Sequence, residues 1–154
     1  ILENKERMGY DNIEVEVNDA TVYREDLAEA FDVVIADVPC SGIGVIGKKC
    51  DIKYRIDETE IKSIVELQKK IMENAWKYVK KGGTLLYSTC TISREENEDM
   101  VEWLLNNAPL ATESLDTYLP KALLSETTKK GYLQLLPGVH ACDGFFIARL
   151  KRVE

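Results

Sequence analysis

The sequence predicts an α/β fold in which parallel strands deliver functional residues to one edge of a sheet. Two short apolar runs, residues 31–36 and 84–88, are bounded by turn residues and have the length of buried parallel strands. Apolar side chains recur at helical spacing over residues 57–80, between the two runs. The 154 residues suffice for one domain with a sizeable core. Because open α/β sheets bind ligands outside the carboxyl ends of their strands, we expect the residues after each run to share one crevice.

Short elements are predicted before and after the first of these strands. A helix over residues 2–8 is expected to end at Gly9, a residue that favours a left-handed cap. Apolar and acidic side chains alternate over residues 13–17, which predicts a half-exposed strand. A short helix over residues 24–29 precedes the first buried strand, and residues 41–54 form a long glycine-containing loop.

Two longer helices are predicted in the middle of the chain. Asp57 can cap the first, which runs to about residue 80 and is ended by the glycine pair at residues 82–83. After the second buried strand, residues 93–96 have the pattern of a capping box for another helix that ends near residue 107.

The C-terminal third is predicted to contain a loop followed by a strand pair. Residues 108–130 are polar and rich in turn formers, which indicates a loop with partial disorder near residues 125–130. Residues 132–136 and 145–150 are apolar runs separated by Pro-Gly and Asp-Gly turns, which predicts an antiparallel strand pair.

Two thiols, a carboxylate and a proline come directly after the two buried strands. Asp37, Pro39 and Cys40 follow the first strand, and Cys90 follows the second. A free cysteine usually behaves as a small buried hydrophobe, so one strand-end cysteine alone would indicate core packing. The presence of thiols at both strand ends, with an aspartate three residues before one of them, favours thiol chemistry at a shared site.

At these positions the chain resembles the Sun/Nop-type RNA cytosine carbon-5 methyltransferases, which use S-adenosylmethionine. The matching segments are residues 37–42 (DVPCSG, against DAPCSG in the family), 88–90 (STC), 95–97 (EEN), 18–20 (NDA), 134–137 (QLLP) and 143–146 (DGFF). The resemblance covers nearly the whole chain. It implies a Rossmann-like class I methyltransferase sheet that is truncated at its N-terminal side and ends in an antiparallel strand pair.

The resemblance also implies a role for each candidate site residue. Cys90 would be the nucleophile that adds to the cytosine, and Cys40 would assist proton removal and product release. Asp37 would contact the cytosine near the cofactor, Pro39 would hold the loop in shape, and Asp19 would bind the adenine amino group. Together, Asp19, Asp37 and Pro39 would form the cofactor-binding set that the resemblance implies. The residues alone leave two points open. In DNA cytosine methyltransferases the Pro-Cys thiol, here Cys40, is the nucleophile, and Asp19 could equally stabilise a turn.

Parts of the family pattern have no counterpart here. The Gly-rich cofactor loop, the acidic ribose-binding residue and the N-terminal RNA-binding region are all missing from the sequence. We therefore expect residues 1–154 to be the C-terminal portion of a single catalytic domain that is inactive alone and binds S-adenosylmethionine weakly. The alternative is a folded, non-catalytic fragment that binds neither cofactor nor RNA. A thiol redox protein is less favoured because the cysteines lack redox spacing.

Charge and composition limit the partners that the chain can have. A net charge of -7 argues against strong nonspecific RNA affinity, because phosphate binding needs clustered cations. One such group, Lys48, Lys49, Lys53 and Arg55, follows Cys40 and could contact phosphates of an RNA substrate, by family default ribosomal RNA. Its alternative is a solvated loop.

The sequence predicts neither a metal site nor a membrane anchor. Four cysteines and one histidine lack the spacing of a zinc site, and no secretory context favours disulfides. No apolar run approaches the roughly 20 residues of a membrane span, and no signal peptide is visible, so we expect a cytoplasmic protein.

The truncation would leave a sheet edge without its usual neighbour. The family orders its strands 3-2-1-4-5-7-6, and by resemblance strands 1 and 2 are missing. Residues 31–36 would then be an apolar edge, which is a template for pairing with another strand. Either residues 13–17 close onto this edge or a second copy pairs there to form a homodimer. The alternation over residues 13–17 suits a half-exposed strand, which favours the homodimer.

Overall fold

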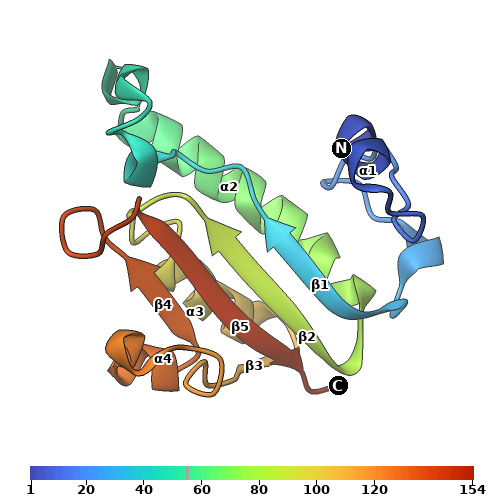
Figure 1. The fold of residues 1–154 in the computed structure, drawn as a ribbon. Helices are drawn as coiled ribbons and strands as arrows, with labels where there is room; N and C mark the ends of the chain where they lie inside the picture. Colours follow the sequence, from blue (N-terminus) through green and yellow to red (C-terminus); the bar gives the residue numbers. More distant parts are fainter. Residues whose placement is uncertain (55) are drawn as a thin grey trace.

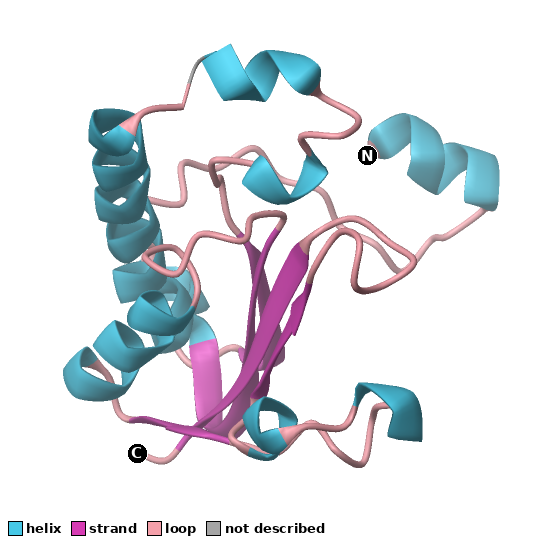
Figure 2. Ribbon diagram, turned by 90° about the vertical axis from the view of Figure 1, so that its left-hand side faces the viewer, coloured by secondary structure: helices cyan, strands magenta, loops and turns pink. Residues whose placement is uncertain are grey.

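A mixed β-sheet forms the centre of the chain, and two long helices cover one of its faces (Figure 1). The structure is a computed structural model that describes residues 1–54 and 56–154. The side view shows the helices stacked against one side of the sheet (Figure 2). The elements are α1 (Leu2–Met8), β1 (Phe31–Asp37), α2 (Glu58–Ala75), β2 (Val79–Thr89), α3 (Glu98–Asn107), β3 (Leu110–Thr112), α4 (Glu126–Lys129), β4 (Tyr132–Leu135) and β5 (Phe145–Arg152).

Strand pairing confirms the predicted α/β fold and its closing antiparallel pair. β1 runs parallel to β2, and the register places Asp37 beside Ser88 at the carboxyl ends of both strands. β5 lies antiparallel to β2 on one side and pairs with both β3 and β4 on the other. The strand that comes last in the chain is therefore in the middle of the sheet.

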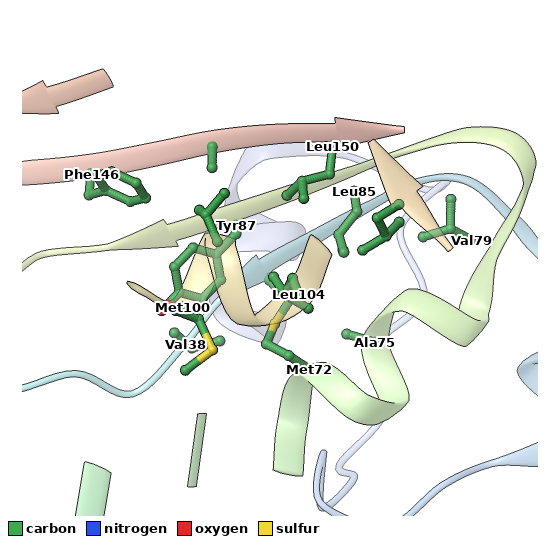
Figure 3. Packing of buried hydrophobic residues seen from close by; sticks show 14 residues of the cluster. Val38, Met72, Ala75, Val79, Leu85, Tyr87, Met100, Leu104, Phe146 and Leu150 are labelled. Carbon is green, nitrogen blue, oxygen red and sulfur yellow. The ribbon is translucent and has the colours of Figure 1, made fainter. Parts of the chain in front are cut away.

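The hydrophobic core lies between the sheet and the helices α2 and α3 (Figure 3). Met72 and Leu104 from the helices are fully buried against Leu85, Tyr87 and other sheet residues. The ring of Tyr87 packs edge-on against Phe146 with a centroid distance of 6.3 Å. This packing fixes the carboxyl end of β2, where the predicted site begins.

The first strand is exposed where the sequence predicted burial. Val33 and Ile35 retain 53% and 69% of their surface, because the face of the sheet opposite α2 and α3 is open beside β1 (Figure 1). The strand predicted over residues 13–17 does not form, and Val17 is fully exposed. Among the described residues β2 is the only strand partner of β1. Closure by residues 13–17 is therefore wrong, and pairing with a second copy stays a prediction.

The glycine pair at residues 82–83 interrupts β2 and does not end α2. The helix capped by Asp57, as predicted, ends at Ala75, and a single 3-10 turn leads into β2. Gly82 has φ 75°, and the register between β1 and β2 shifts here. A Cβ on Gly83 would lie 2.8 Å from the carbonyl oxygen of Asp32. The glycines thus allow a bulge and a close approach of two backbones.

Three smaller predictions are also corrected or refined. The helix over residues 2–8 ends at Gly9 with φ 68°, as predicted, whereas only a 3-10 turn, Glu25–Leu27, forms within residues 24–29. The loop over residues 41–54 contains two further 3-10 turns. Residues 93–96 do not cap α3: its N-cap is Asn97, because the Glu96 side chain turns inward to bind Ser41.

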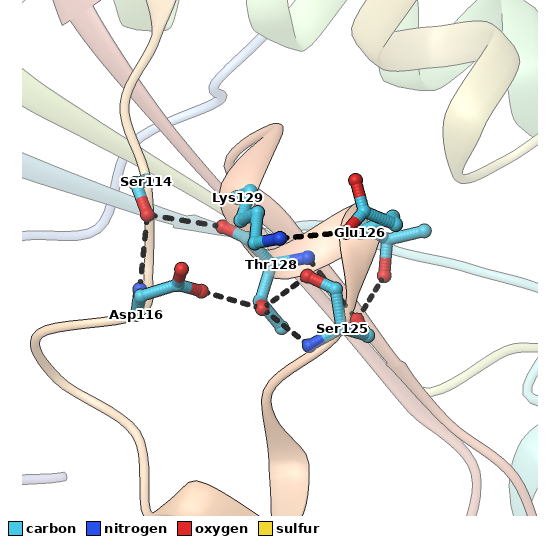
Figure 4. A network of polar contacts seen from close by, with 7 residues as sticks. Ser114, Asp116, Ser125, Glu126, Thr128 and Lys129 are labelled. Carbon is cyan, nitrogen blue, oxygen red and sulfur yellow. Dashed lines mark hydrogen bonds and ion pairs between the residues drawn. The ribbon is translucent and has the colours of Figure 1, made fainter.

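Residues 125–130 are ordered by hydrogen bonds where the sequence predicted disorder (Figure 4). Ser125 caps α4 in a capping box with Thr128. The buried Thr128 hydroxyl also donates to Asp116 Oδ1 at 2.6 Å. Residues 108–130 therefore contain β3 and α4 in addition to loops.

Candidate active site

The two thiols predicted to share a crevice lie in direct contact. Cys40 follows β1 and Cys90 follows β2, and their Sγ atoms are 3.2 Å apart although 50 residues separate them in the chain. The backbone N–H of Cys90 also donates to Cys40 Sγ at 3.3 Å. Both side chains are half-buried, whereas Cys50 and Cys142 are exposed. Parallel pairing of β1 and β2 brings these two residues together.

The environment of Cys40 keeps its thiol protonated. Burial is the main cause that raises the pKa of Cys40, and the contact with Cys90 acts in the same direction, so that together they raise it to about 12. A thiol with this pKa is almost entirely protonated at neutral pH and can donate to the neighbouring sulfur.

Asp37 lies beside the thiols at the end of β1. Its carboxylate is exposed, and the hydroxyl of buried Ser88 donates to Oδ1 at 3.2 Å. The backbone N–H of Val38 continues the strand pairing by donating to the Ser88 carbonyl oxygen at 3.2 Å. These contacts orient a solvent-accessible carboxylate on the same edge of the sheet as the thiols.

A buried polar cluster holds the segment around Cys40. Glu96 is fully buried, and its carboxyl accepts hydrogen bonds from the Ser41 backbone N–H at 2.9 Å, the Ser41 hydroxyl at 2.5 Å and Gln68 Nε2 at 3.1 Å. Gln68 also donates to the carbonyl oxygen of Pro39 at 2.9 Å. The hydroxyl of Tyr87 donates to the Glu96 carbonyl oxygen at 2.6 Å. Burial, and then the nearby Glu96 carboxyl, raise the pKa of Tyr87, so its hydroxyl stays a donor.

A second buried cluster holds the segment around Cys90. Asn97 accepts from the Thr89 hydroxyl at 2.6 Å and donates to the carbonyl oxygen of Thr91 at 3.1 Å. Its amide also donates to Gln134 Oε1 at 2.7 Å, and Gln134 in turn donates to the Phe145 carbonyl oxygen at 3.1 Å. Residues from α3, β4 and β5 therefore fix both flanks of Cys90.

Sequence patterns point to several residues of these two clusters but do not indicate what the residues bind. Residues 95–97 and 134–137 match the family pattern, and residues 95–96 also belong to the predicted capping box, but neither pattern indicates these contacts. Gln68 interrupts the apolar side of α2, between Ile64 and Met72 at one-turn spacing, and a fully buried glutamine there indicates a specific partner. The partners lie 19 or more residues away, so the sequence alone could not identify them.

Two glycines join the Cys40 and Cys90 loops to the start of β5. The backbone N–H of Gly44 donates to the Cys90 carbonyl oxygen at 3.1 Å, and the Gly144 N–H donates to the Gly44 carbonyl oxygen at 2.8 Å. A Cβ on Gly44 would lie 2.5 Å from the Gly144 carbonyl oxygen and 2.8 Å from that of Cys90. Only glycine fits this junction without movement of the backbone.

A pocket of about 450 Å³ contains all three residues predicted to bind the cofactor. Asp19, Asp37 and Pro39 line it together with apolar side chains such as Ile35 and Leu67. Asp19 also forms the turn given as its alternative role, because Oδ1 accepts from the hydroxyl and the backbone N–H of Thr21. These bonds lower the pKa of Asp19 and keep the carboxylate ionised. The pocket thus offers an apolar wall with carboxylates at its rim.

A second cavity of about 360 Å³ opens onto both thiols. Cys40 and Cys90 line it with Lys49, Glu60 and several isoleucines. Lys48 Nζ pairs with Asp143 Oδ2 at 2.6 Å, and Lys53 Nζ lies 4.8 Å from the centroid of the Tyr54 ring. The fourth predicted cation, Arg55, lies outside the described residues. Of the three described cations, Lys49 is thus the one that lines the cavity with the thiols.

The described residues form neither a metal-binding cluster nor a membrane-spanning helix. Within residues 1–54 and 56–154, no group of three or more His, Cys, Asp or Glu side chains is arranged to hold a metal ion. The same residues contain no helix with the length and apolar character needed to cross a membrane.

Comparison with known proteins identifies close relatives over nearly the whole chain. The family model for 16S rRNA methyltransferase RsmB/F matches residues 1–151. Ribosomal RNA small subunit methyltransferase F from Klebsiella pneumoniae (strain 342) is 37% identical over 150 residues, which cover 97% of this chain and 31% of that protein. The chain therefore spans about a third of the length of this curated relative.

Solved structures share the fold. PH0851 superposes with a TM-score of 0.86 at 33% identity, covering 97% of this chain and 33% of that one. A methyltransferase homolog protein from Pyrococcus horikoshii superposes with a TM-score of 0.78 at 31% identity, covering 98% and 48%. These matches confirm the predicted methyltransferase-type α/β architecture.

Proposed function

The chain belongs to the 16S rRNA methyltransferase RsmB/F family, and from that membership and its paired thiols we propose that it forms part of the catalytic domain of a ribosomal RNA cytosine carbon-5 methyltransferase. The observation that carries this proposal is the 3.2 Å contact between Cys40 and Cys90 at the carboxyl ends of adjacent parallel strands. A methylation that passes through a covalent cysteine adduct needs one thiol to attack and a second group to move protons nearby.

Cys90 is the nucleophile in this proposal. Carbon 5 of cytosine is a poor nucleophile, and a thiolate that adds to carbon 6 moves the electrons of the 5,6 double bond toward carbon 5. Asp37, near ring nitrogen 3, supplies the proton that accompanies the addition. The raised pKa of Cys40 supports the assignment, since a thiol that keeps its proton is a weak attacking group.

Cys40 completes the reaction by moving protons. The methylated base is released when carbon 5 loses its proton and the bond between carbon 6 and the Cys90 sulfur breaks. Cys40 gives its own proton to the departing sulfur, 3.2 Å away, and takes up the proton from carbon 5. The electrons of the carbon–hydrogen bond restore the double bond, and those of the carbon–sulfur bond stay on sulfur. Both thiols end this step protonated, and ring nitrogen 3 returns its proton to Asp37.

The pocket next to the thiols suits S-adenosylmethionine. When bound, that cofactor supplies an electrophilic methyl group. Asp19 would accept from the adenine amino group, Pro39 and the apolar wall would contact the ring, and Asp37 would lie between cofactor and base. Apolar side chains with a few placed polar groups are typical of such sites.

Trapping of the covalent adduct tests the assignment of the two thiols. The complete protein is incubated with S-adenosylmethionine and RNA that contains a mechanism-based cytosine analogue, and the products are separated by mass. We expect Cys40→Ala to accumulate the adduct and Cys90→Ala to form none. The assignment fails if Cys90→Ala still forms the adduct and Cys40→Ala does not.

Titration calorimetry separates the enzyme fragment from the alternative of a non-binding remnant. We expect residues 1–154 alone to bind S-adenosylmethionine more weakly than a low-micromolar dissociation constant, roughly -8 kcal/mol, because these residues do not include the Gly-rich loop that would hold the amino-acid end of the cofactor. Tighter binding would show that the cofactor site is misplaced. If the complete protein also binds no S-adenosylmethionine, the chain is part of a non-catalytic protein.

The lysines near the thiols are proposed to contact RNA phosphates. Each phosphate contact contributes about 0.7 to 0.9 to the slope of log affinity against log salt concentration. We expect Lys48→Ala with Lys49→Ala to lower that slope by about 1.4 to 1.8 in the complete protein. The matched control is Lys129→Ala, on the distant helix α4, where the lysine pairs with Glu126. If the Lys48→Ala, Lys49→Ala double variant and Lys129→Ala have the same slope, the loop lysines are solvated charges that do not contact RNA.

A further inference from the structure

We propose that Glu96 is a positioning residue whose buried carboxyl group holds the Cys40 thiol in contact with Cys90. Glu96 touches neither thiol. It acts through Ser41, the residue that follows Cys40, and through Gln68, which binds the residue that precedes Cys40. This role adds to the proposed chemistry a residue that neither thiol motif contains.

The contacts restrain both sides of Cys40. On one side, Gln68 Nε2 donates to the carbonyl oxygen of Pro39 at 2.9 Å and also to Glu96 Oε2 at 3.1 Å. On the other side, Glu96 accepts from both the backbone and the hydroxyl of Ser41. The peptide from Pro39 to Ser41 is therefore fixed at two points, and the Cys40 side chain between them keeps little freedom.

The same carboxyl group connects the two thiol loops. Glu96 lies six positions after Cys90 in the chain. The Ser41 hydroxyl that it binds is also 2.8 Å from the Thr91 hydroxyl, directly after Cys90. Any shift of the Cys40 loop relative to the Cys90 loop breaks at least one of these bonds. The cluster therefore sets the separation of the two sulfur atoms.

The type of residue at position 96 matches the donors around it. Three N–H and O–H groups converge on the two carboxyl oxygens, which a carboxylate accepts without conflict. Across residues 1–54 and 56–154, no ion pair to Glu96 is found. A fully buried carboxyl that only neutral groups bind is costly to keep, and its hydrogen bonds must recover that cost. This supports a specific task for Glu96.

The separation of the thiols can be measured by thiol–disulfide exchange without RNA or cofactor. The exposed Cys50 and Cys142 are first replaced by serine. The protein is then equilibrated with reduced and oxidised glutathione, so that two thiols and one glutathione disulfide give one protein disulfide and two reduced glutathiones. Mass spectrometry measures the oxidised fraction. The equilibrium constant reports how well Cys40 and Cys90 are held together.

We expect Glu96→Ala to lower this equilibrium constant about tenfold, which corresponds to about 30 mV for a two-electron couple. Gln68→Ala should lower it in the same direction. Glu96→Gln should restore it to within about threefold of the parent, because the amide keeps one acceptor and the Ser41 hydroxyl can turn to accept from its NH₂ group. If Glu96→Ala fails to fold, Gln68→Ala and Glu96→Gln still test the proposal.

The matched control is Thr128→Val, which removes the hydroxyl of another fully buried residue (Figure 4). Thr128 lies on α4, away from the carboxyl ends of β1 and β2 that the thiols follow (Figure 1). It should reduce stability, through loss of the bonds to Asp116 and Ser125, and leave the thiol equilibrium unchanged. The proposal is overturned if Glu96→Ala leaves the constant unchanged or raises it, if Thr128→Val lowers it equally, or if the parent forms no disulfide. Because the readout needs no methyl transfer, these outcomes are independent of the proposed function.

Discussion

The substitution Gly44→Ala should destabilise the protein, because the new Cβ would collide with the backbone at Gly144 and at Cys90. The added Cβ would lie 2.5 Å from the Gly144 carbonyl oxygen and 2.8 Å from that of Cys90. Both are backbone atoms, so no flexible side chain can move aside. Relief must lengthen the hydrogen bonds from Gly44 to Cys90 and from Gly144 to Gly44.

The magnitude follows from these contacts. Overpacking of a well-packed site costs about 1–3 kcal/mol, and the loss of unfolded-state freedom on changing glycine to alanine offsets about 0.4–1 kcal/mol of that. A weakened backbone hydrogen bond adds about 0.5–1.5 kcal/mol. We expect a net loss of about 1–3 kcal/mol. At about 2–4 °C per kcal/mol for a chain of this size, the melting temperature should fall by about 2–12 °C.

Thermal unfolding followed by circular dichroism measures this change, and Gly47→Ala is the matched control in the same loop. A Cβ on Gly47 would meet nothing within 4 Å, and neither glycine has a positive φ. Gly47→Ala should melt at or slightly above the parent temperature. If Gly44→Ala and Gly47→Ala melt together, the junction is less tightly packed than the structure indicates and the reasoning is refuted.

Four further outcomes can be checked directly. In timed alkylation read by peptide mass spectrometry, Cys50 and Cys142 should react well before Cys40, because they are exposed and the pKa of Cys40 is raised to about 12; equal rates would contradict its burial. Since the folded pKa of Cys40 exceeds its ordinary value of 9.0, the unfolded chain releases this proton first, and the contribution of Cys40 to stability should be constant below about pH 9 and be lost as pH rises toward 12. Urea titrations at several pH values measure that loss, and Cys40→Ser should reduce it. Leu104→Ala, at a fully buried position, should cost about 2–5 kcal/mol in the same assay, and a loss below 1 kcal/mol would show that the core readily collapses around it. Sedimentation over a concentration series should show self-association through the open edge of β1, and a monomer at every concentration would exclude it.

Local patterns were sufficient to predict the elements that carry the site. The structure contains the predicted strands over residues 31–36 and 84–88, the helix between them and the closing strand pair. Each of these elements has a sequence pattern that lies within its own residues. Parallel pairing of the first two then places Cys40 and Cys90 at one edge. The register of Asp37 with Ser88 brings the two cysteine loops to the same edge of the sheet.

Where the predictions were wrong, a distant partner decided between two local alternatives. Residues 93–96 have the pattern of a capping box, but Ser41, 55 residues away, binds the Glu96 carboxyl instead. A glycine pair can end a helix or allow a bulge, and the approach of Asp32 to Gly83 selects the bulge. The exposure of β1 likewise depends on which neighbour it has, and a strand's own sequence does not contain that information.

The position of β5 has a consequence for biosynthesis. β5 follows β2, β3 and β4 in the chain, yet it pairs with all three, and among the described strands β3 and β4 have no other partner. While residues 145–154 remain in the ribosomal exit tunnel, these three strands cannot assemble around their central neighbour. A chain that lacks residues 145–154 would therefore lose the antiparallel half of the sheet, and Gly144, which donates to Gly44, would no longer be held by the strand that follows it.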